Sequence, residues 1–195
     1  MNKLHAVIIC ALLFSACTPL KTLENTPAPV QPTIAQPTAT PIAQQIPSTW
    51  KTYTNAQLGV SFSYPPEYAE PNITNNELIS LISPLEANKS PKQQEGLAST
   101  ELKVEIYVTK NYTKTIEEAA IEQDEQAKQN NTTFEIQDWR TLAGTKAYYR
   151  KGSGLGTFEN YFVISNNKLY TIAKYPDTTS RQPEFELFLQ SLKFI

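Results

Sequence analysis

"YTNAQLGVSFSYPPEY", residues 53–68, carries the strand signal from which the fold of this chain of 195 residues can be worked out. Val60, Phe62 and Tyr64 alternate with serines, and a period of two is typical of a strand that buries one face. The proline pair at 65–66 ends the run, because proline has no N–H to donate within a sheet. The stretch therefore predicts that the domain opens on a half-buried strand.

More strands are predicted downstream. Apolar and polar side chains alternate again at residues 102–108. Four further runs are rich in Tyr, Phe, Ile and Val, at residues 134–142, 145–150, 158–165 and 168–175. Turn signals separate them, namely Ala143-Gly144, residues 152–156 and Asn166-Asn167. We expect these runs to form an antiparallel meander.

A first helix is predicted over residues 115–129. Thr115 and Glu118 form a capping box, in which each side chain accepts a hydrogen bond from a free backbone N–H at the helix start. Asn130-Asn131 ends the helix. Its buried stripe would comprise mostly small side chains: Ile116, Ala119, Ala120, Gln123 and Ala127. So thin a stripe lets the helix lie close against a sheet.

A second helix is predicted near the C-terminus. Pro183 suits a first helical turn. Apolar side chains recur after it at helical spacing, at Phe185, Phe188, Leu189 and Leu192. We expect this helix to dock on the sheet and Phe194 to extend the edge of the sheet.

The two ends of the domain resemble those of PsbP-like domains. In residues 53–68 a Tyr-Thr-Asn turn leads into a Gly-x-Ser-Phe strand, then Tyr-Pro and an aromatic residue, as in that family. The closing "FELFLQSLKFI", residues 185–195, resembles the helix and short strand that finish such domains. Tyr68 stands where the family often has Trp.

The resemblance implies an α+β fold for residues 49–195, with an antiparallel β-sheet flanked by helices in a PsbP-like α/β/α sandwich. The founding members of the family assist assembly or stabilise a complex. For this chain the resemblance thus implies a binding or accessory role, and fold alone does not fix the ligand.

The N-terminus has the features of a secretory leader. Lys3 precedes an apolar run at residues 6–14, which is shorter than the roughly 20 residues that span a bilayer. The run leads into "LFSAC", which resembles the lipobox of bacterial lipoproteins. That resemblance implies a signal peptide at residues 1–16, cleavage before Cys17 and lipid attachment to Cys17.

The alternatives for Cys17 are a disulfide or a free thiol in a secreted or membrane-anchored chain. Its one candidate partner, Cys10, lies inside the leader that would be removed. We expect an extracytoplasmic protein whose lipid binds the outer face of the cytoplasmic membrane or the outer membrane. An envelope protein or a glycan would be its partner.

Residues 17–48 are expected to be a disordered tether. Residues 18–48 hold seven of the fourteen prolines, among Thr, Gln and Ala. Proline removes backbone donors, and the stretch has too little apolar area to offset the entropy of ordering. The tether would hold the domain clear of the membrane.

The residue types exclude several chemistries. The single histidine, His5, lies in the leader, and Cys17 is consumed by lipid. Histidine triads, histidine metal sites and thiol nucleophiles are therefore not expected in the mature chain. A net charge of −2 gives no basic face for nucleic acid. We expect no catalytic residue, cofactor or metal.

The alternative is a cell-envelope enzyme that uses carboxylates, for example on glycan. Such an enzyme needs two carboxyl groups about 5 to 10 Å apart across a cleft. The densest acidic cluster lies on the first helix: Glu117, Glu118, Glu122, Asp124 and Glu125. It suggests either a weak site for a hard cation or, more simply, a solvated helix face.

Two further patterns allow two interpretations each. Five tyrosines fall in neighbouring strands near three basic residues: Tyr148, Tyr149, Tyr161, Tyr170 and Tyr175, with Lys146, Arg150 and Lys174. They form either an aromatic binding surface or the filling beneath the helices. "KGSGLG", residues 151–156, lacks the Lys-Ser/Thr ending of a phosphate-binding loop, so we predict a hairpin connection there.

Overall fold

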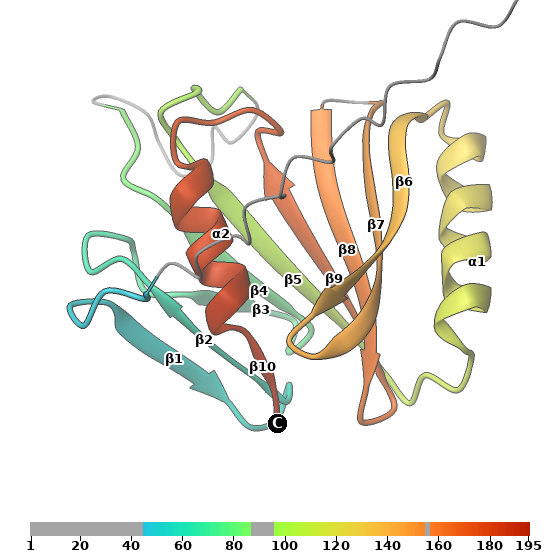
Figure 1. Cartoon of the computed structure of the whole chain (residues 1–195), viewed down its shortest axis with the longest axis horizontal. Helices are drawn as coiled ribbons and strands as arrows, with labels where there is room; N and C mark the ends of the chain where they lie inside the picture. Colours follow the sequence, from blue (N-terminus) through green and yellow to red (C-terminus); the bar gives the residue numbers. More distant parts are fainter. Residues whose placement is uncertain (1–44, 87–95, 155–156) are drawn as a thin grey trace, which may run out of the picture. The chain divides into compact units, whose positions relative to one another are not determined.

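Two antiparallel sheets and two helices make up the computed structural model, which describes residues 45–86, 96–154 and 157–195 (Figure 1). The described residues belong to one compact unit. The strands are β1 (Lys51–Asn55), β2 (Val60–Tyr64), β3 (Asn72–Thr74), β4 (Leu78–Ile82), β5 (Lys103–Lys110), β6 (Thr133–Leu142), β7 (Thr145–Ser153), β8 (Thr157–Ser165), β9 (Lys168–Tyr175) and β10 (Lys193–Phe194). The helices are α1 (Ile116–Gln129) and α2 (Gln182–Ser191).

The larger sheet has seven strands in the order β3-β4-β5-β9-β8-β7-β6, and the smaller has three in the order β1-β2-β10. The predicted α+β fold, an antiparallel sheet flanked by helices, is confirmed. The small second sheet was not predicted. The predictions for the leader at 1–16, for Cys17 and for the tether up to residue 44 lie outside the described residues.

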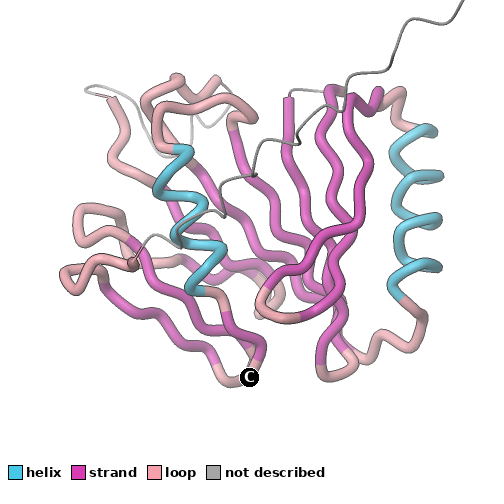
Figure 2. Tube along the Cα trace, in the orientation of Figure 1, coloured by secondary structure: helices cyan, strands magenta, loops and turns pink. Residues whose placement is uncertain are grey.

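Side chains of the large sheet alternate between its two faces. One face packs against α2 and the small sheet. This core contains Phe62 of β2, Tyr161 of β8, Ile172 of β9 and Phe188 of α2. Figure 2 shows α2 and α1 as two separate helices beside the strands. Neither helix of the described part of the chain has the length and apolarity needed to span a membrane.

The opposite face of the large sheet packs against α1. Ala119 and Ala120 of the helix contact a second core of Tyr148, Phe162 and Leu169. The capping box of Thr115 and Glu118 is present as predicted. Of the predicted stripe, Ala119, Ala120 and Ala127 are buried, and Ile116 and Gln123 are half-buried. The small stripe does bring the helix close to the sheet.

The C-terminal helix also docks as predicted. Phe185 and Phe188 are buried, and the Phe188 ring lies 4.9 Å from that of Phe62. Phe194 pairs with Val60 in the three-stranded sheet. It therefore extends the edge of the small sheet and not that of the meander.

Two details differ from the sequence predictions. The Tyr-Thr-Asn segment belongs to β1, because Tyr53 pairs with Phe62 of β2, and the turn follows it. Lys151, Gly152 and Ser153 belong to β7 and not to the predicted hairpin connection at 151–156. Gly152 is required there because an added Cβ would overlap the carbonyl oxygen of Thr133 on the neighbouring strand.

Candidate functional site

The five tyrosines do not form one binding surface. Tyr148 faces α1, whereas Tyr149, Tyr161 and Tyr170 face α2 and the small sheet. All four are buried, and Tyr175 is half-buried. The Tyr148 hydroxyl donates to Asp124 Oδ2 at 2.6 Å, and the strand alternation explains why neighbours in sequence end on opposite faces. The four buried tyrosines therefore fill the space beneath the helices and the small sheet, and Tyr175 does not.

The three basic residues that accompany them are also separated. Lys146 is exposed and lies 4.2 Å from the centre of the Trp139 ring. Arg150 is buried, and its Nη1 lies 3.2 Å from Asp124 Oδ1. Lys174 is buried on the other face of the sheet, beneath α2.

The carboxylates of α1 diverge to different partners. Glu117 accepts from Lys146 at 2.5 Å, and Glu122 accepts from Lys114 at 2.9 Å. Glu118 is used by the capping box and Asp124 by Arg150. Within the described residues no group of three acidic, histidine or cysteine side chains gathers as a metal site requires. The helix face therefore presents local ion pairs.

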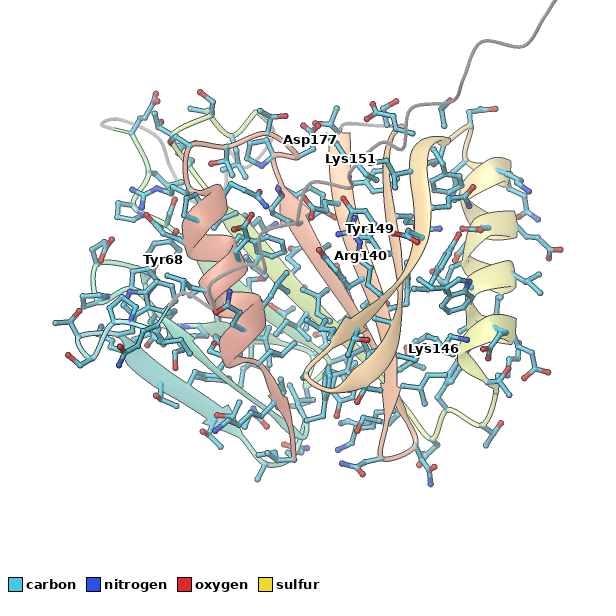
Figure 3. The ribbon with its side chains drawn as sticks, in the orientation of Figure 1. Tyr68, Arg140, Lys146, Tyr149, Lys151 and Asp177 are labelled. Carbon is cyan, nitrogen blue, oxygen red and sulfur yellow. The ribbon has the colours of Figure 1, made fainter. Side chains whose placement is uncertain are left out.

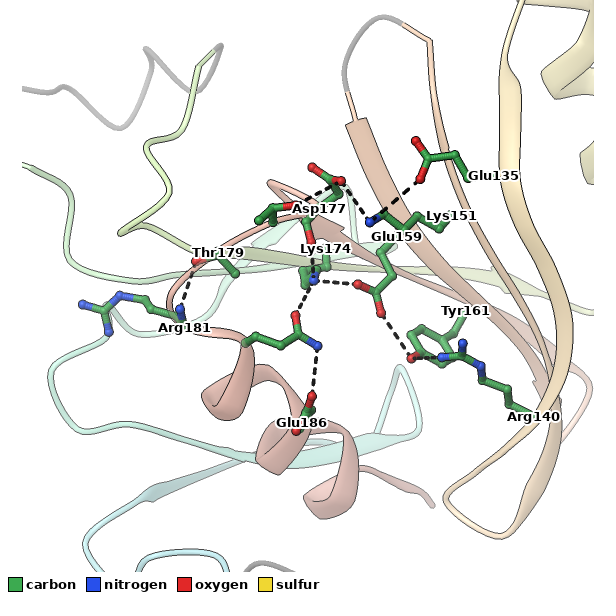
Figure 4. A network of polar contacts seen from close by, with 12 residues as sticks. Glu135, Arg140, Lys151, Glu159, Tyr161, Lys174, Asp177, Thr179, Arg181 and Glu186 are labelled. Carbon is green, nitrogen blue, oxygen red and sulfur yellow. Dashed lines mark hydrogen bonds and ion pairs between the residues drawn. The ribbon is translucent and has the colours of Figure 1, made fainter. Parts of the chain in front are cut away.

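A buried polar network crosses the sheet beneath α2 (Figure 4). Lys174 Nζ donates to Glu159 Oε2 at 2.6 Å, to Gln182 Oε1 at 2.5 Å and to the Asp177 carbonyl at 2.8 Å. An ammonium group has three protons to donate, so its capacity is used in full. The network thereby ties the first turn of α2 to β8 and β9.

The same network continues toward the edge strand β6. Tyr161 donates to Glu159 Oε1 at 3.3 Å and accepts from Arg140 Nη1 at 3.1 Å. The Arg140 guanidinium carbon lies 3.3 Å from the centre of the Tyr149 ring (Figure 3). Because its buried members satisfy one another, we interpret this network as a scaffold for the surfaces around it.

The candidate site is an open groove on the α1 side of the large sheet. Cross-strand partners share a face of a sheet. Glu105 pairs with Ala173, which pairs in turn with Asn160 and thereby with Arg150, which contacts α1. Glu105 therefore lies on the same face as α1. That helix packs on β7 and β8, whereas the groove lies over β3, β4 and β5. It has a volume of about 400 Å³ and is lined by Ala69, Glu70, Asn72, Thr74, Leu78, Ser80, Ile82 and Glu105.

The groove combines an apolar floor with polar side chains. Leu78 and Ile82 of β4 are half-buried, while Ile79 and Leu81 between them point into the core. A second hollow, of about 420 Å³, lies beside Tyr107. Tyr107 lines this second hollow and is the cross-strand partner of Leu78, which lines the groove. The Tyr107 side chain is 45% exposed.

Two carboxylates line the groove, and each is held by a lysine. Glu105 Oε1 lies 2.6 Å from Lys103 Nζ, and Glu70 Oε1 lies 3.1 Å from Lys51 Nζ. The hydrogen bond from Tyr64 and the charge of Lys51 lower the pKa of Glu70. A general acid needs a raised pKa, so exposed Glu70 does not have the environment of a general acid.

The charge of Glu105 also affects the aromatic side chains beside it. Burial, together with Glu105, raises the pKa of Tyr175 to about 12. The pKa of Tyr107 is raised by the same two causes. Both phenols are therefore neutral hydrogen-bonding groups at physiological pH.

This groove was not predicted from the sequence. β3 and β4 were not predicted, because β3 is short and polar and the outer face of β4 carries apolar Leu78 and Ile82 on either side of its one polar residue, Ser80. The run "LISLI" at Leu78–Ile82 is the signal that could have identified β4. The contact of β4 with Glu105 depends on strand pairing, which the sequence does not give directly.

Comparison with known proteins places the chain in a family. A family model described as "PsbP-like protein" matches residues 6–194, and the chain therefore belongs to the PsbP-like family. No curated protein sequence is similar enough to count as a relative.

Solved structures were also compared, and one of them supports the fold. The solution structure of cyanobacterial PsbP (CyanoP) from Synechocystis sp. PCC 6803 matches with a TM-score of 0.50 and 10% identity, covering 82% of this chain and 100% of that one. The Ran-binding protein Mog1p of Saccharomyces cerevisiae is also similar, with a TM-score of 0.46 and 8% identity, covering 74% of this chain and 95% of that chain. The cyanobacterial likeness supports the fold alone.

Proposed function

We propose that this protein is a lipid-anchored, extracytoplasmic accessory module that binds a partner of the cell envelope through the groove over β3, β4 and β5. Membership of the PsbP-like family supports a binding role and not catalysis. The partner would be an envelope protein or a glycan, because the groove offers hydrogen-bonding side chains above an apolar floor.

One observation carries the binding part of the proposal. Among the described elements α1 packs over only part of its face of the large sheet, at β7 and β8. On the remaining part, Leu78 and Ile82 are half-buried and Tyr107 is 45% exposed. Aromatic side chains with one apolar and one polar end are frequent in binding surfaces, so this part of the face is suited to a partner.

We favour binding over the alternative of a carboxylate enzyme for a specific reason. The groove does contain two carboxylates, but Lys103 holds one and Lys51 holds the other. The exposed Glu70 has a lowered pKa, the opposite of the shift that a general acid needs. The two acids are thus bound to structural partners.

The binding part is tested by affinity capture of the full chain from detergent-solubilised envelopes. Tyr107→Ala removes the exposed ring beside the groove residue Leu78. It should reduce the amount of co-purified partner at least several-fold, with an unchanged unfolding midpoint. Ile121→Ala is the matched control, because Ile121 is 61% exposed on the outer side of α1, away from the groove. Equal capture by both variants and the unchanged chain would contradict the proposal.

The anchoring part rests on the sequence of residues 12–17 and is tested separately. Several acyl chains give durable membrane attachment, so loss of the thiol should be decisive. In fractionated cells, Cys17→Ser should shift the protein from the membrane pellet to the soluble fraction or leave an uncleaved precursor. A mutant that is cleaved normally and still sediments with membranes would exclude lipid attachment at Cys17.

A further inference from the structure

β6 is a long strand at the edge of the large sheet. Its strand partner within the described residues is β7, on one side, and its other side ends the sheet. Most of its side chains are exposed, including two large apolar ones, Ile136 at 43% and Trp139 at 43%. An edge of this kind carries backbone N–H and C=O groups on which another strand can add. In the single copy the Trp139 N–H donates to the exposed Asp138 Oδ1 at 2.8 Å, a bond that pairing with a second strand would replace.

The regular part of β6 has defined limits. A register shift between Phe134 and Ile136 breaks the pairing with β7 at one end. At the other end Ala143 and Gly144 have positive φ angles of 50° and 75°, which turn the chain into β7. The uninterrupted part of the edge is therefore residues 136–142.

This seven-residue segment, "IQDWRTL", has the same chemical order in both directions about Trp139. When two copies of this segment pair antiparallel about Trp139, apolar side chains face apolar ones and uncharged polar side chains face polar ones. Each acidic side chain faces a basic one. The pairs are Trp139 with Trp139, Asp138 with Arg140, Gln137 with Thr141 and Ile136 with Leu142. Such facing pairs are what stabilise antiparallel strands.

The side chains at the centre are held in suitable positions. Asp138 and Arg140 lie on one face of β6, with Arg140 Nε 3.8 Å from Asp138 Oδ2. Their side chains are 59% and 38% exposed, so both remain accessible to a second copy. On the other face Trp139 packs against the Tyr148 ring at 5.2 Å between centroids.

We propose that two copies of this chain pair edge to edge through β6, antiparallel and centred on Trp139. The pairing forms one continuous sheet across the two-fold axis and places two Asp138–Arg140 ion pairs on one face. The groove lies at β3 to β5, and β3 is the opposite edge of the same sheet. Self-association through β6 therefore leaves the groove free and stands independently of the proposed binding function.

Disulfide cross-linking tests both the interface and its register. Facing residues of antiparallel strands have Cα atoms about 4.5 or 5.5 Å apart, which is within the range of about 4.4 to 6.8 Å that a disulfide spans. The full chain with Trp139→Cys, in mildly oxidised cell envelopes, should give a dimer on non-reducing electrophoresis that reductant removes. The unchanged chain controls for Cys10 and Cys17.

Thr141→Cys is the matched control on the same strand and the same face. In the proposed register Thr141 faces Gln137, so two cysteines at 141 would be separated by four residues, or about 13 Å along the strand. We expect several-fold less dimer from Thr141→Cys than from Trp139→Cys. No dimer from Trp139→Cys, or equal yields from the two variants, would overturn the proposal.

The charge pairing is tested in the Trp139→Cys background. Asp138→Lys places lysine opposite Arg140 twice in the dimer, and it should reduce the cross-linked fraction several-fold. Glu135→Lys makes the same change of charge on the same strand, outside the regular segment, and should leave the fraction nearly unchanged. An equal effect of the two substitutions would contradict pairing centred on Trp139.

Discussion

Lys174 and Glu159 form a buried ion pair, with 2.6 Å between Nζ and Oε2. They are cross-strand partners on β9 and β8, and their side chains are 1% and 9% exposed. The lysine also donates to Gln182 in the first turn of α2. The pair thus links the meander to the helix that covers it.

Removing the acid from this pair should destabilise the domain strongly. Glu159→Ala leaves a buried ammonium group without its counter-charge, and breaking such a pair costs about 3 to 5 kcal/mol. Urea unfolding of the purified protein measures the loss. Glu117→Ala, which breaks the exposed pair with Lys146, is the control and should shift the midpoint little. Similar shifts for the two variants would show that the network is not a structural link.

A second prediction concerns the packing of α2. Phe188 is 2% exposed, and its ring lies 4.9 Å from that of Phe62 and 6.0 Å from that of Phe185. Phe188→Ala should cost about 3 to 5 kcal/mol of unfolding free energy. Glu186→Ala changes an exposed position on the same helix and should stay within about 0.5 kcal/mol of the unchanged protein. An unchanged denaturant midpoint for Phe188→Ala would contradict the packed helix.

Alkaline pH should destabilise the domain through Tyr148. Burial and the hydrogen bond to Asp124 raise the pKa of Tyr148 to about 12 in the folded protein. The unfolded chain loses the phenol proton near pH 10, so between about pH 10 and 12 the unfolded state binds fewer protons. Stability from this group is therefore complete below pH 10 and lost as the pH rises toward 12.

Unfolding curves at several pH values measure this effect. Tyr148→Phe should lower stability at neutral pH, because Asp124 loses a donor, and should make the fall between pH 10 and 12 less steep. An identical slope for the variant and the unchanged protein would show that Tyr148 does not contribute to the pH dependence.

Local signals in the sequence predicted the elements that depend on local chemistry. The capping box of Thr115 and Glu118 located the start of α1, and the alternation at Val60, Phe62 and Tyr64 located β2. The spacing of Phe185 and Phe188 predicted the buried face of α2. Each of these signals lies within a few residues of the feature that it specifies.

Features that depend on strand pairing could not be predicted in this way. β3 is three residues long, and β4 exposes Leu78 and Ile82 where a strand with one solvated face would have polar side chains. The groove requires β4 to lie beside β5, and the buried ion pair requires the register of β8 with β9. From the sequence alone, Lys174 would be expected to be solvated. The register of β8 with β9 instead places it against Glu159.

The most direct test of the account is photo-cross-linking from the groove in intact cell envelopes. A benzophenone amino acid in place of Ser80, which lines the groove, should form a covalent adduct with one envelope component. The same amino acid in place of Ile121, on the outer side of α1, should not form that adduct. A specific adduct from position 80 is the result that the account predicts. The absence of any adduct from position 80, or the same adducts from both positions, would contradict binding at the groove.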